Sequence, residues 1–188
     1  MVKDFMTQLD DLSGYEDIDQ QLSLSGTGQQ FVTFYIKDEK YALDIKSIRE
    51  FITFSQITQM PNLPAYVKGI INLRGNIIPV VDLRARFNLE ELLYDKYTVI
   101  IIVQVESKHV GMVVDAVSDV IFLSEDHIQP PPDFATNIDM DFITGMGQHN
   151  DELVILVDGE KLLSPKELLM LSSENDTKNF TNTIQEKL

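Results

Sequence analysis

Residues 69–82 read Gly-Ile-Ile-Asn-Leu-Arg-Gly-Asn-Ile-Ile-Pro-Val-Val-Asp, and this stretch decides the fold class. Two apolar segments flank residues 74–76, Arg-Gly-Asn, where glycine and, to a lesser degree, asparagine tolerate the positive φ of a tight turn. The stretch therefore predicts a β-hairpin. Pro79 lacks a backbone N–H, which predicts an edge or a bulge. Asp82 predicts the N-cap of a short helix at 83–87.

The same plan is written twice along the chain. Residues 31–45 hold an apolar segment, a charged turn and a second apolar segment, and residues 97–116 repeat this order. In each copy a later apolar segment also runs into an aspartate. Because the repeat is longer than the unit of a solenoid, it predicts two similar small β units. Two such units offer two surfaces and one cleft, which suits holding partners together. The corresponding aspartates are Asp44 with Asp115, and Asp82 with Asp158.

The two ends of the chain differ from its middle. Residues 1–29 are acidic and rich in Gln, Ser and Gly, which predicts a flexible arm. Ser164 is a helix cap, Pro165 suits the first turn and Glu167 completes a capping box, so a helix is expected from 166 to about 172.

The fold class expected from these features is mostly β, with two small antiparallel barrels, short helices and a C-terminal helix. The expected boundaries are an arm at 1–29, a domain at 30–172 and a frayed tail at 173–188. Within the domain, the expected halves are roughly 30–95, together with the C-terminal helix, and 96–160.

The composition excludes several classes of function. The chain of 188 residues has no cysteine, which excludes disulfides and thiolate metal sites. No apolar run is long enough to cross a bilayer, and the N-terminus does not resemble a signal peptide, so we expect a cytoplasmic protein. The net charge of −15 argues against nucleic acid and against an anionic membrane surface as partners.

The charge is unevenly distributed. Residues 31–86 hold eight basic and five acidic residues, a net charge of +3. Residues 109–160 hold eleven acidic residues and no lysine or arginine, a net charge of −11. One interpretation is solubility alone. The other is that the two segments form faces of opposite charge, which steer a head-to-tail association between proteins.

Patterns of catalytic and metal-binding residues are missing from the sequence. His109, His127 and His149 stand alone, without the spacing of metal ligands. No Gly-x-Ser-x-Gly motif and no phosphate-binding glycine motif occurs. The strand-end aspartates could form an acid–base pair, but their recurrence in both copies favours a capping role. We therefore expect no catalytic residue, metal or cofactor, and a β-rich interaction module.

Several linked motifs go further. Residues 64–84, which contain the Asn-Leu-Arg-Gly turn, are similar to the signature of the CheW family of bacterial chemotaxis coupling proteins. The resemblance continues in the same order through the second half and covers residues 30–171. The further matching segments are 111–120, 128–134, 142–145 and 153–163.

The resemblance implies a fold of two five-stranded, SH3-like barrels around a shared apolar interface. It implies a non-enzymatic scaffold that links the cytoplasmic tips of chemoreceptors to the histidine kinase CheA, in arrays at the inner face of the membrane. It does not assign the residues that bind the kinase.

In the family, the helical hairpin of the receptor tip lies in the groove between the barrels. The resemblance leaves two roles open for Arg74, which could pair with Glu50 across this groove or hold its own turn. The matching groove positions are Ile45, Ile48, Glu50, Phe51, Arg74, Ile77, Val99 and Gly111.

Two other functions remain open at this point. One is an adaptor of the same fold in another signalling array, such as one for surface motility or gene control. The other is a small-molecule-binding or enzymatic barrel that uses its aspartates, which would need convergent polar groups in a pocket.

Overall fold

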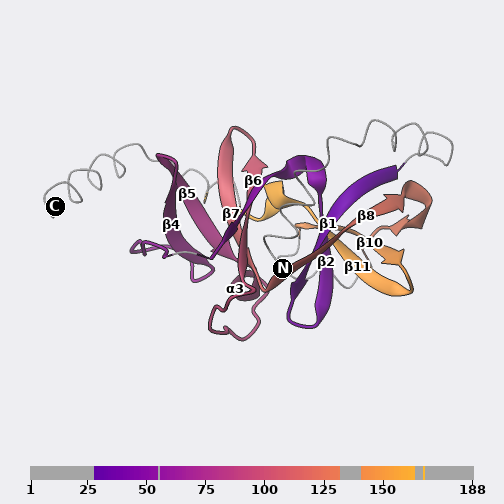
Figure 1. Cartoon of the computed structure of the whole chain (residues 1–188), viewed down its shortest axis with the longest axis horizontal. Helices are drawn as coiled ribbons and strands as arrows, with labels where there is room; N and C mark the ends of the chain where they lie inside the picture. Colours follow the sequence, from indigo (N-terminus) through magenta and orange to yellow (C-terminus); the bar gives the residue numbers. More distant parts are fainter. Residues whose placement is uncertain (1–27, 55, 132–140, 164–166, 168–188) are drawn as a thin grey trace, which may run out of the picture.

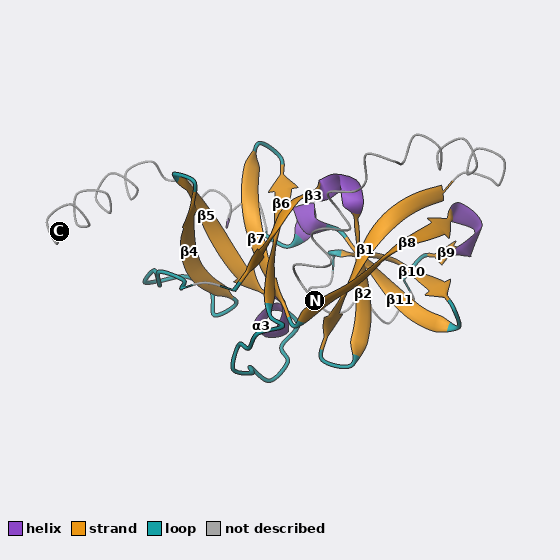
Figure 2. Ribbon diagram, in the orientation of Figure 1, coloured by secondary structure: helices purple, strands orange, loops and turns teal. Residues whose placement is uncertain are grey.

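The computed structural model describes residues 28–54, 56–131, 141–163 and 167 (Figure 1). Within these residues the chain forms two β-sheets that lie next to each other, with short helices at their ends (Figure 2). The first sheet has the order β8 (Ala116–Ser124), β1 (Gly28–Ile36), β2 (Glu39–Asp44), β11 (Glu152–Val157), β10 (Ile143–His149) and β9 (Ile128–Gln129). The second has the order β3 (Ile48–Thr53), β6 (Val99–Val105), β7 (Lys108–Val114), β5 (Asn76–Asp82) and β4 (Val67–Leu73).

Each sheet forms one barrel, so the expected fold class of two small barrels is confirmed. We call them the six-stranded and the five-stranded barrel. The five-stranded barrel is closed by backbone hydrogen bonds in both directions between Thr58 and Ile70, each 2.9 Å long. In the six-stranded barrel, the segment that follows β8 makes the corresponding contact with β10. Two of its residues pair with β10 and form the short strand β9, so this barrel has six strands.

The barrels exchange hairpins between the two copies of the repeat. Hairpin β1–β2 of the first copy joins β8, β10 and β11 of the second, and hairpin β6–β7 of the second copy joins β3, β4 and β5 of the first. Each hairpin is joined on one side by a parallel pair, β2 with β11 or β7 with β5, and on the other by an antiparallel pair, β1 with β8 or β6 with β3. The expected halves at 30–95 and 96–160 are therefore wrong as structural units, because each barrel takes strands from both.

Three apolar clusters hold this arrangement together. One fills the six-stranded barrel around Phe31 and Leu156, and one fills the five-stranded barrel around Ile78 and Ile100. The largest lies between the barrels and takes side chains from both sheets. Strand β6 explains how this works: its residues alternate between the shared cluster and the interior of its own barrel, so its uninterrupted apolar run is buried on both faces.

The predicted hairpin at 69–82 is confirmed as β4 and β5, with details that differ. The positive φ angles fall on Arg74 (53°) and Gly75 (88°), not on Asn76. Pro79 lies in a central strand, not at an edge, while the facing strand β4 carries a bulge between Val67 and Gly69.

Helix boundaries agree where the structure describes them. The predicted helix at 83–87 is α3 (Leu83–Arg86), capped by the side chain of Asp82. Three 3-10 helices complete the described part: η2 (Ile45–Ser47), η3 (Glu125–His127) and η5 (Gly159–Lys161). None of the helices found in the described residues is long and apolar enough to cross a membrane.

The expected end segments fall largely outside the described residues. Strand β1 begins at Gly28, opposite Ser124, so the first strand starts two residues before the expected start of the domain at residue 30. Residues 1–27, the expected tail at 173–188 and the expected C-terminal helix, apart from Glu167, lie outside the described residues.

Candidate functional site

An ion pair between Glu50 and Arg74 marks one surface of the five-stranded barrel. Arg74 donates from Nη1 to Oε1 of Glu50 at 3.0 Å and from Nη2 to Oε2 at 2.9 Å. This two-bond geometry fixes the orientation of both side chains. The pair joins the edge strand β3 to the β4–β5 turn of the same barrel. Of the two roles left open for Arg74, pairing with Glu50 is the one observed. The pair lies within one barrel, however, and does not span the groove between the two barrels.

The backbone of Arg74 does not set it apart from other turn residues. Lys37, Glu106 and Asn150 begin three other tight hairpin turns with φ angles of 58°, 53° and 50°, close to the 53° of Arg74. The left-handed conformation costs each of these residues about 1–2 kcal/mol. What distinguishes Arg74 is its side chain, which stays 76% exposed while it holds a carboxylate.

An exposed apolar side chain lies on the same hairpin. Ile77 stands opposite Asn72 and is 45% exposed, although its neighbour Ile78 is buried in the barrel. A large aliphatic side chain beside an oriented ion pair is typical of a partner-binding surface, where apolar contacts supply affinity and charges supply orientation.

The other expected groove residues divide into two groups. Ile45 and Ile48 are half-buried and pack against the shared cluster between the barrels. Phe51 and Val99 belong to that cluster, and the side chain of Val99 is fully buried. They lie beneath the surface and support Ile45 and Ile48 from below.

Gly111 is not part of the same group. It lies inside the five-stranded barrel, where an added Cβ would come within 2.8 Å of Cγ2 of Ile100. Glycine is needed there for packing. The structure thus brings together Glu50 and Arg74, leaves Ile77 exposed on the same hairpin as Arg74, and places Val99, Phe51 and Gly111 in the interior.

The strand-end aspartates act largely as the sequence predicts. Asp44, Asp82 and Asp158 each accept a backbone N–H from the helix that follows, at 2.9, 3.2 and 2.9 Å. Their capping role is confirmed. Asp82 also accepts the phenol hydroxyl of Tyr94 at 2.6 Å, and burial followed by this hydrogen bond raises the pKa of Tyr94.

Asp115 has a different role. It accepts Nε and Nη2 of Arg84 at 2.7 and 2.6 Å, and the backbone N–H of Lys37 at 2.6 Å. The hydrogen bonds to Asp115 raise the pKa of Arg84 above its ordinary value. Sequence reasoning missed this pair, because Arg84 and Asp115 are separated by 31 positions and only the parallel pairing of β5 with β7 brings them together.

A second missed feature is the loop that precedes β6. Leu92 is 57% exposed, Leu93 is 97% exposed and Tyr97 is 44% exposed. The sequence signal was present as Leu-Leu-Tyr inside an otherwise charged segment, which is unusual for a solvated loop.

The described residues give no support for metal chemistry. Across the described ranges, no group of three or more histidine, aspartate or glutamate side chains is placed to hold a metal ion. His127 contacts the hydroxyl of Ser124 at 3.3 Å.

Comparison with known proteins agrees with the geometry. The CheW-like domain family matches residues 30–167. The chemotaxis protein CheW of Klebsiella aerogenes is 40% identical over 146 residues, which cover 78% of this chain and 88% of that protein. The chemotaxis protein CheW of Treponema pallidum is 36% identical over 148 residues, which cover 77% and 87%.

A solved structure agrees as well. The scaffolding protein TtCheW from Thermoanaerobacter tengcongensis superposes with a TM-score of 0.69 at 37% sequence identity, over 75% of this chain and 96% of that one. Chemotaxis protein CheV3 of Helicobacter pylori matches more weakly, at 24% identity and 47% of its length. The family match spans most of the chain and includes both barrels, and on these grounds the chain belongs to the CheW family of chemotaxis proteins.

Proposed function

We propose that this chain is a non-enzymatic chemotaxis scaffold that couples the cytoplasmic tips of chemoreceptors to the histidine kinase CheA, in arrays at the inner face of the membrane. The names of its relatives support the general role, since they are chemotaxis proteins and one is described as a scaffolding protein. The same match favours this role over an adaptor in another signalling system and over a small-molecule-binding barrel.

The observation that carries the proposal is the oriented Glu50–Arg74 pair together with exposed Ile77 on the hairpin that holds Arg74. A helical hairpin presents apolar residues along one face and polar residues at its margins. Ile77 would contact this apolar face, and the half-buried Ile45 and Ile48 would add apolar surface. The Arg74 guanidinium keeps donors that Glu50 does not use, and these can bind carbonyl or carboxylate oxygens at the helix margin.

The test compares two charge reversals at equivalent turn positions. Arg74→Glu places two carboxylates together and should weaken binding of a receptor-tip fragment at least tenfold, which is about 1.4 kcal/mol. Lys37→Glu is the matched control, because Lys37 begins the β1–β2 turn with nearly the same φ and is also exposed. It should leave receptor binding unchanged.

Folding and kinase binding separate the possible causes. Both variants should keep the melting temperature within a few degrees, because exposed ion pairs contribute about 0.2–1 kcal/mol. Binding to the CheA regulatory domain should persist in Arg74→Glu. If this folded variant binds the receptor tip as well as the unsubstituted protein does, the receptor docks elsewhere and the groove assignment is wrong.

A further inference from the structure

The two barrels have equivalent mouths, and among the described residues a cation of the chain fills only one of them. Each mouth lies where two parallel strands reach an aspartate. Asp44 ends β2 and Asp158 follows β11, while Asp82 ends β5 and Asp115 follows β7. The repeat makes these two pairs of carboxylates correspond. Comparing what surrounds them shows what each mouth requires.

In the five-stranded barrel the chain supplies a cation. Arg84, two residues after Asp82, binds Asp115 through two hydrogen bonds, and the loop before β6 adds the Tyr94 hydroxyl on Asp82. Arg84 is 9% exposed. The pocket left at this mouth is small, about 120 Å³, and Leu92 and Leu93 contribute to its wall.

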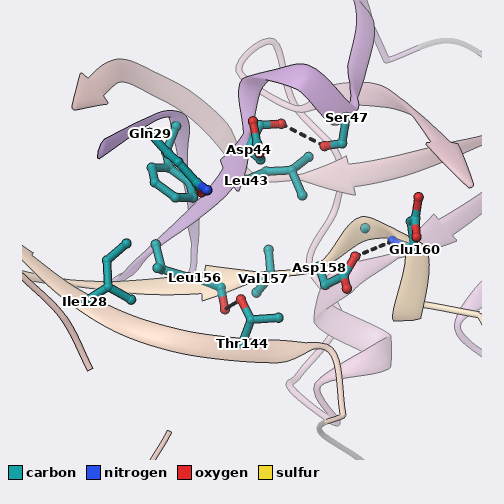
Figure 3. Close-up of a pocket in the computed structure, with 12 residues that line it drawn as sticks. Gln29, Leu43, Asp44, Ser47, Ile128, Thr144, Leu156, Val157, Asp158 and Glu160 are labelled. Carbon is teal, nitrogen blue, oxygen red and sulfur yellow. Dashed lines mark hydrogen bonds between the residues drawn. The ribbon is translucent and has the colours of Figure 1, made fainter. Parts of the chain in front are cut away.

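In the six-stranded barrel the corresponding residue has the opposite charge. Glu160 lies two residues after Asp158, where Arg84 follows Asp82, so this position cannot supply a guanidinium to Asp44, and no other described residue does. The pocket here is larger, about 370 Å³, and opens between η2 and η5 (Figure 3). Its lining combines Asp44, Asp158 and Glu160 with apolar walls, and none of the described residues that line it is a lysine or arginine. The apolar lining residues are Phe31, Leu43, Ile128, Leu156 and Val157.

The capping bonds leave acceptor capacity at this mouth. Asp44 uses Oδ1 for the N–H of Lys46, and Asp158 uses Oδ1 for the N–H of Glu160. Lys161 approaches Oδ2 of Asp158 only to 3.7 Å, and its side chain is 53% exposed. Among the described residues, the pocket therefore carries three carboxylates, one of which forms a long salt bridge with the half-exposed Lys161.

We propose that this pocket receives an arginine side chain from a partner protein, which supplies the cation that Arg84 supplies in the other barrel. A guanidinium binds carboxylates through two parallel hydrogen bonds, and its aliphatic stem suits apolar walls. The site lies on the other barrel from the Glu50–Arg74 pair, so it is a separate contact from the proposed receptor surface. Residues 1–27 are a poor source of the cation, because they hold six acidic residues and only one basic residue, Lys3.

The test uses a short peptide as the probe and the full chain as the protein. Acetyl-Leu-Arg-Leu-amide is titrated into ¹⁵N-labelled protein, with the citrulline version of the peptide as the uncharged control. The arginine peptide should shift the backbone amides of Lys46 and Glu160, which donate to Asp44 and Asp158, and the citrulline peptide should not. Equal shifts with both peptides, or none at these amides, would overturn the proposal.

Substitutions in the protein locate the binding. Asp44→Asn keeps an N-cap residue and should weaken the peptide about tenfold or more, the change expected from losing a charge-assisted hydrogen bond. Asp151→Asn removes the same charge from the exposed β10–β11 turn and should have no effect. Glu160→Arg recreates the arrangement of Arg84, so it should raise the melting temperature and abolish peptide binding. Retained binding in Glu160→Arg would show that the peptide binds outside the pocket.

Discussion

Replacing Arg84 with methionine tests how firmly the two barrels are joined. The Arg84 side chain is 11% exposed and binds Asp115, which also accepts the Lys37 N–H from the β1–β2 turn of the other barrel. Methionine keeps much of the aliphatic stem but removes every donor. Asp115 would then be left with a single backbone partner in a largely enclosed position.

The expected loss follows from the burial of the pair. Removing one partner of a fully buried ion pair costs about 3–5 kcal/mol. The Asp115 side chain is 29% exposed, so water can solvate part of the remaining charge, and we expect about 2–3 kcal/mol. In a protein of this size such a loss lowers the melting temperature by about 4–12 °C.

Urea unfolding provides the measurement, because a change in midpoint at constant slope reports stability alone. Arg49→Met is the matched control: Arg49 is exposed and donates to Gln104, so its replacement should stay within about 0.5 kcal/mol. Combining Arg84→Met with Asp115→Asn should cost less than the two single losses added together. A stability of Arg84→Met equal to that of Arg49→Met would refute the structural role of the pair.

Three further outcomes follow from the structure. Burial and Asp82 raise the pKa of Tyr94, so above about pH 10 the folded chain keeps a phenol proton that the unfolded chain loses. The free energy of unfolding should therefore fall as the pH rises above about 10. In urea titrations at alkaline pH, Tyr94→Phe should show a shallower fall. Gly69→Ala should severely destabilise the fold in thermal melts, because φ is +137° and the new Cβ would lie 2.1 Å from the carbonyl oxygen of Thr58, a backbone atom that cannot move aside easily. A chain that starts at residue 27 should have the same melting temperature as the full chain. A chain that starts at residue 30 loses the pairing of Gly28 with Ser124 and should have a lower melting temperature. Equal melting temperatures of the two shortened chains would show that this end of β1 does not contribute to stability.

Local features of the fold could be predicted from the sequence. The hairpin at 69–82 and the capping role of Asp82 follow from turn chemistry and short-range hydrogen bonds, which depend on neighbouring residues. The exchange of hairpins could not be predicted in this way. It depends on parallel contacts such as Tyr41 with Ile155, which are far apart in the sequence, and the alternation of apolar residues does not say which strand lies alongside.

The candidate site could also be predicted only in part, because the sequence does not show which residues the folded chain buries. The motif resemblance identified Arg74 and Glu50, and the structure brings them into contact. It could not show that Val99 is fully buried while Ile77 is 45% exposed, since both are β-branched residues in apolar segments. Which face of a strand meets solvent is decided by the packing of two barrels against each other, a property of the assembled fold.

The hairpin exchange has a mechanical consequence for a scaffold. The chain passes from the five-stranded to the six-stranded barrel between β7 and β8, and Asp115 lies at this crossing with its backbone N–H donated to the carbonyl of Tyr35 at 3.1 Å. Its carboxylate simultaneously holds Arg84 of one barrel and the Lys37 N–H of the other. Rotation of one barrel against the other would therefore break a charged contact and expose the shared apolar cluster. The Glu50–Arg74 surface and the acidic pocket therefore lie at a fixed mutual orientation, and if both bind partners as proposed, a partner at one barrel would set the position of a partner at the other.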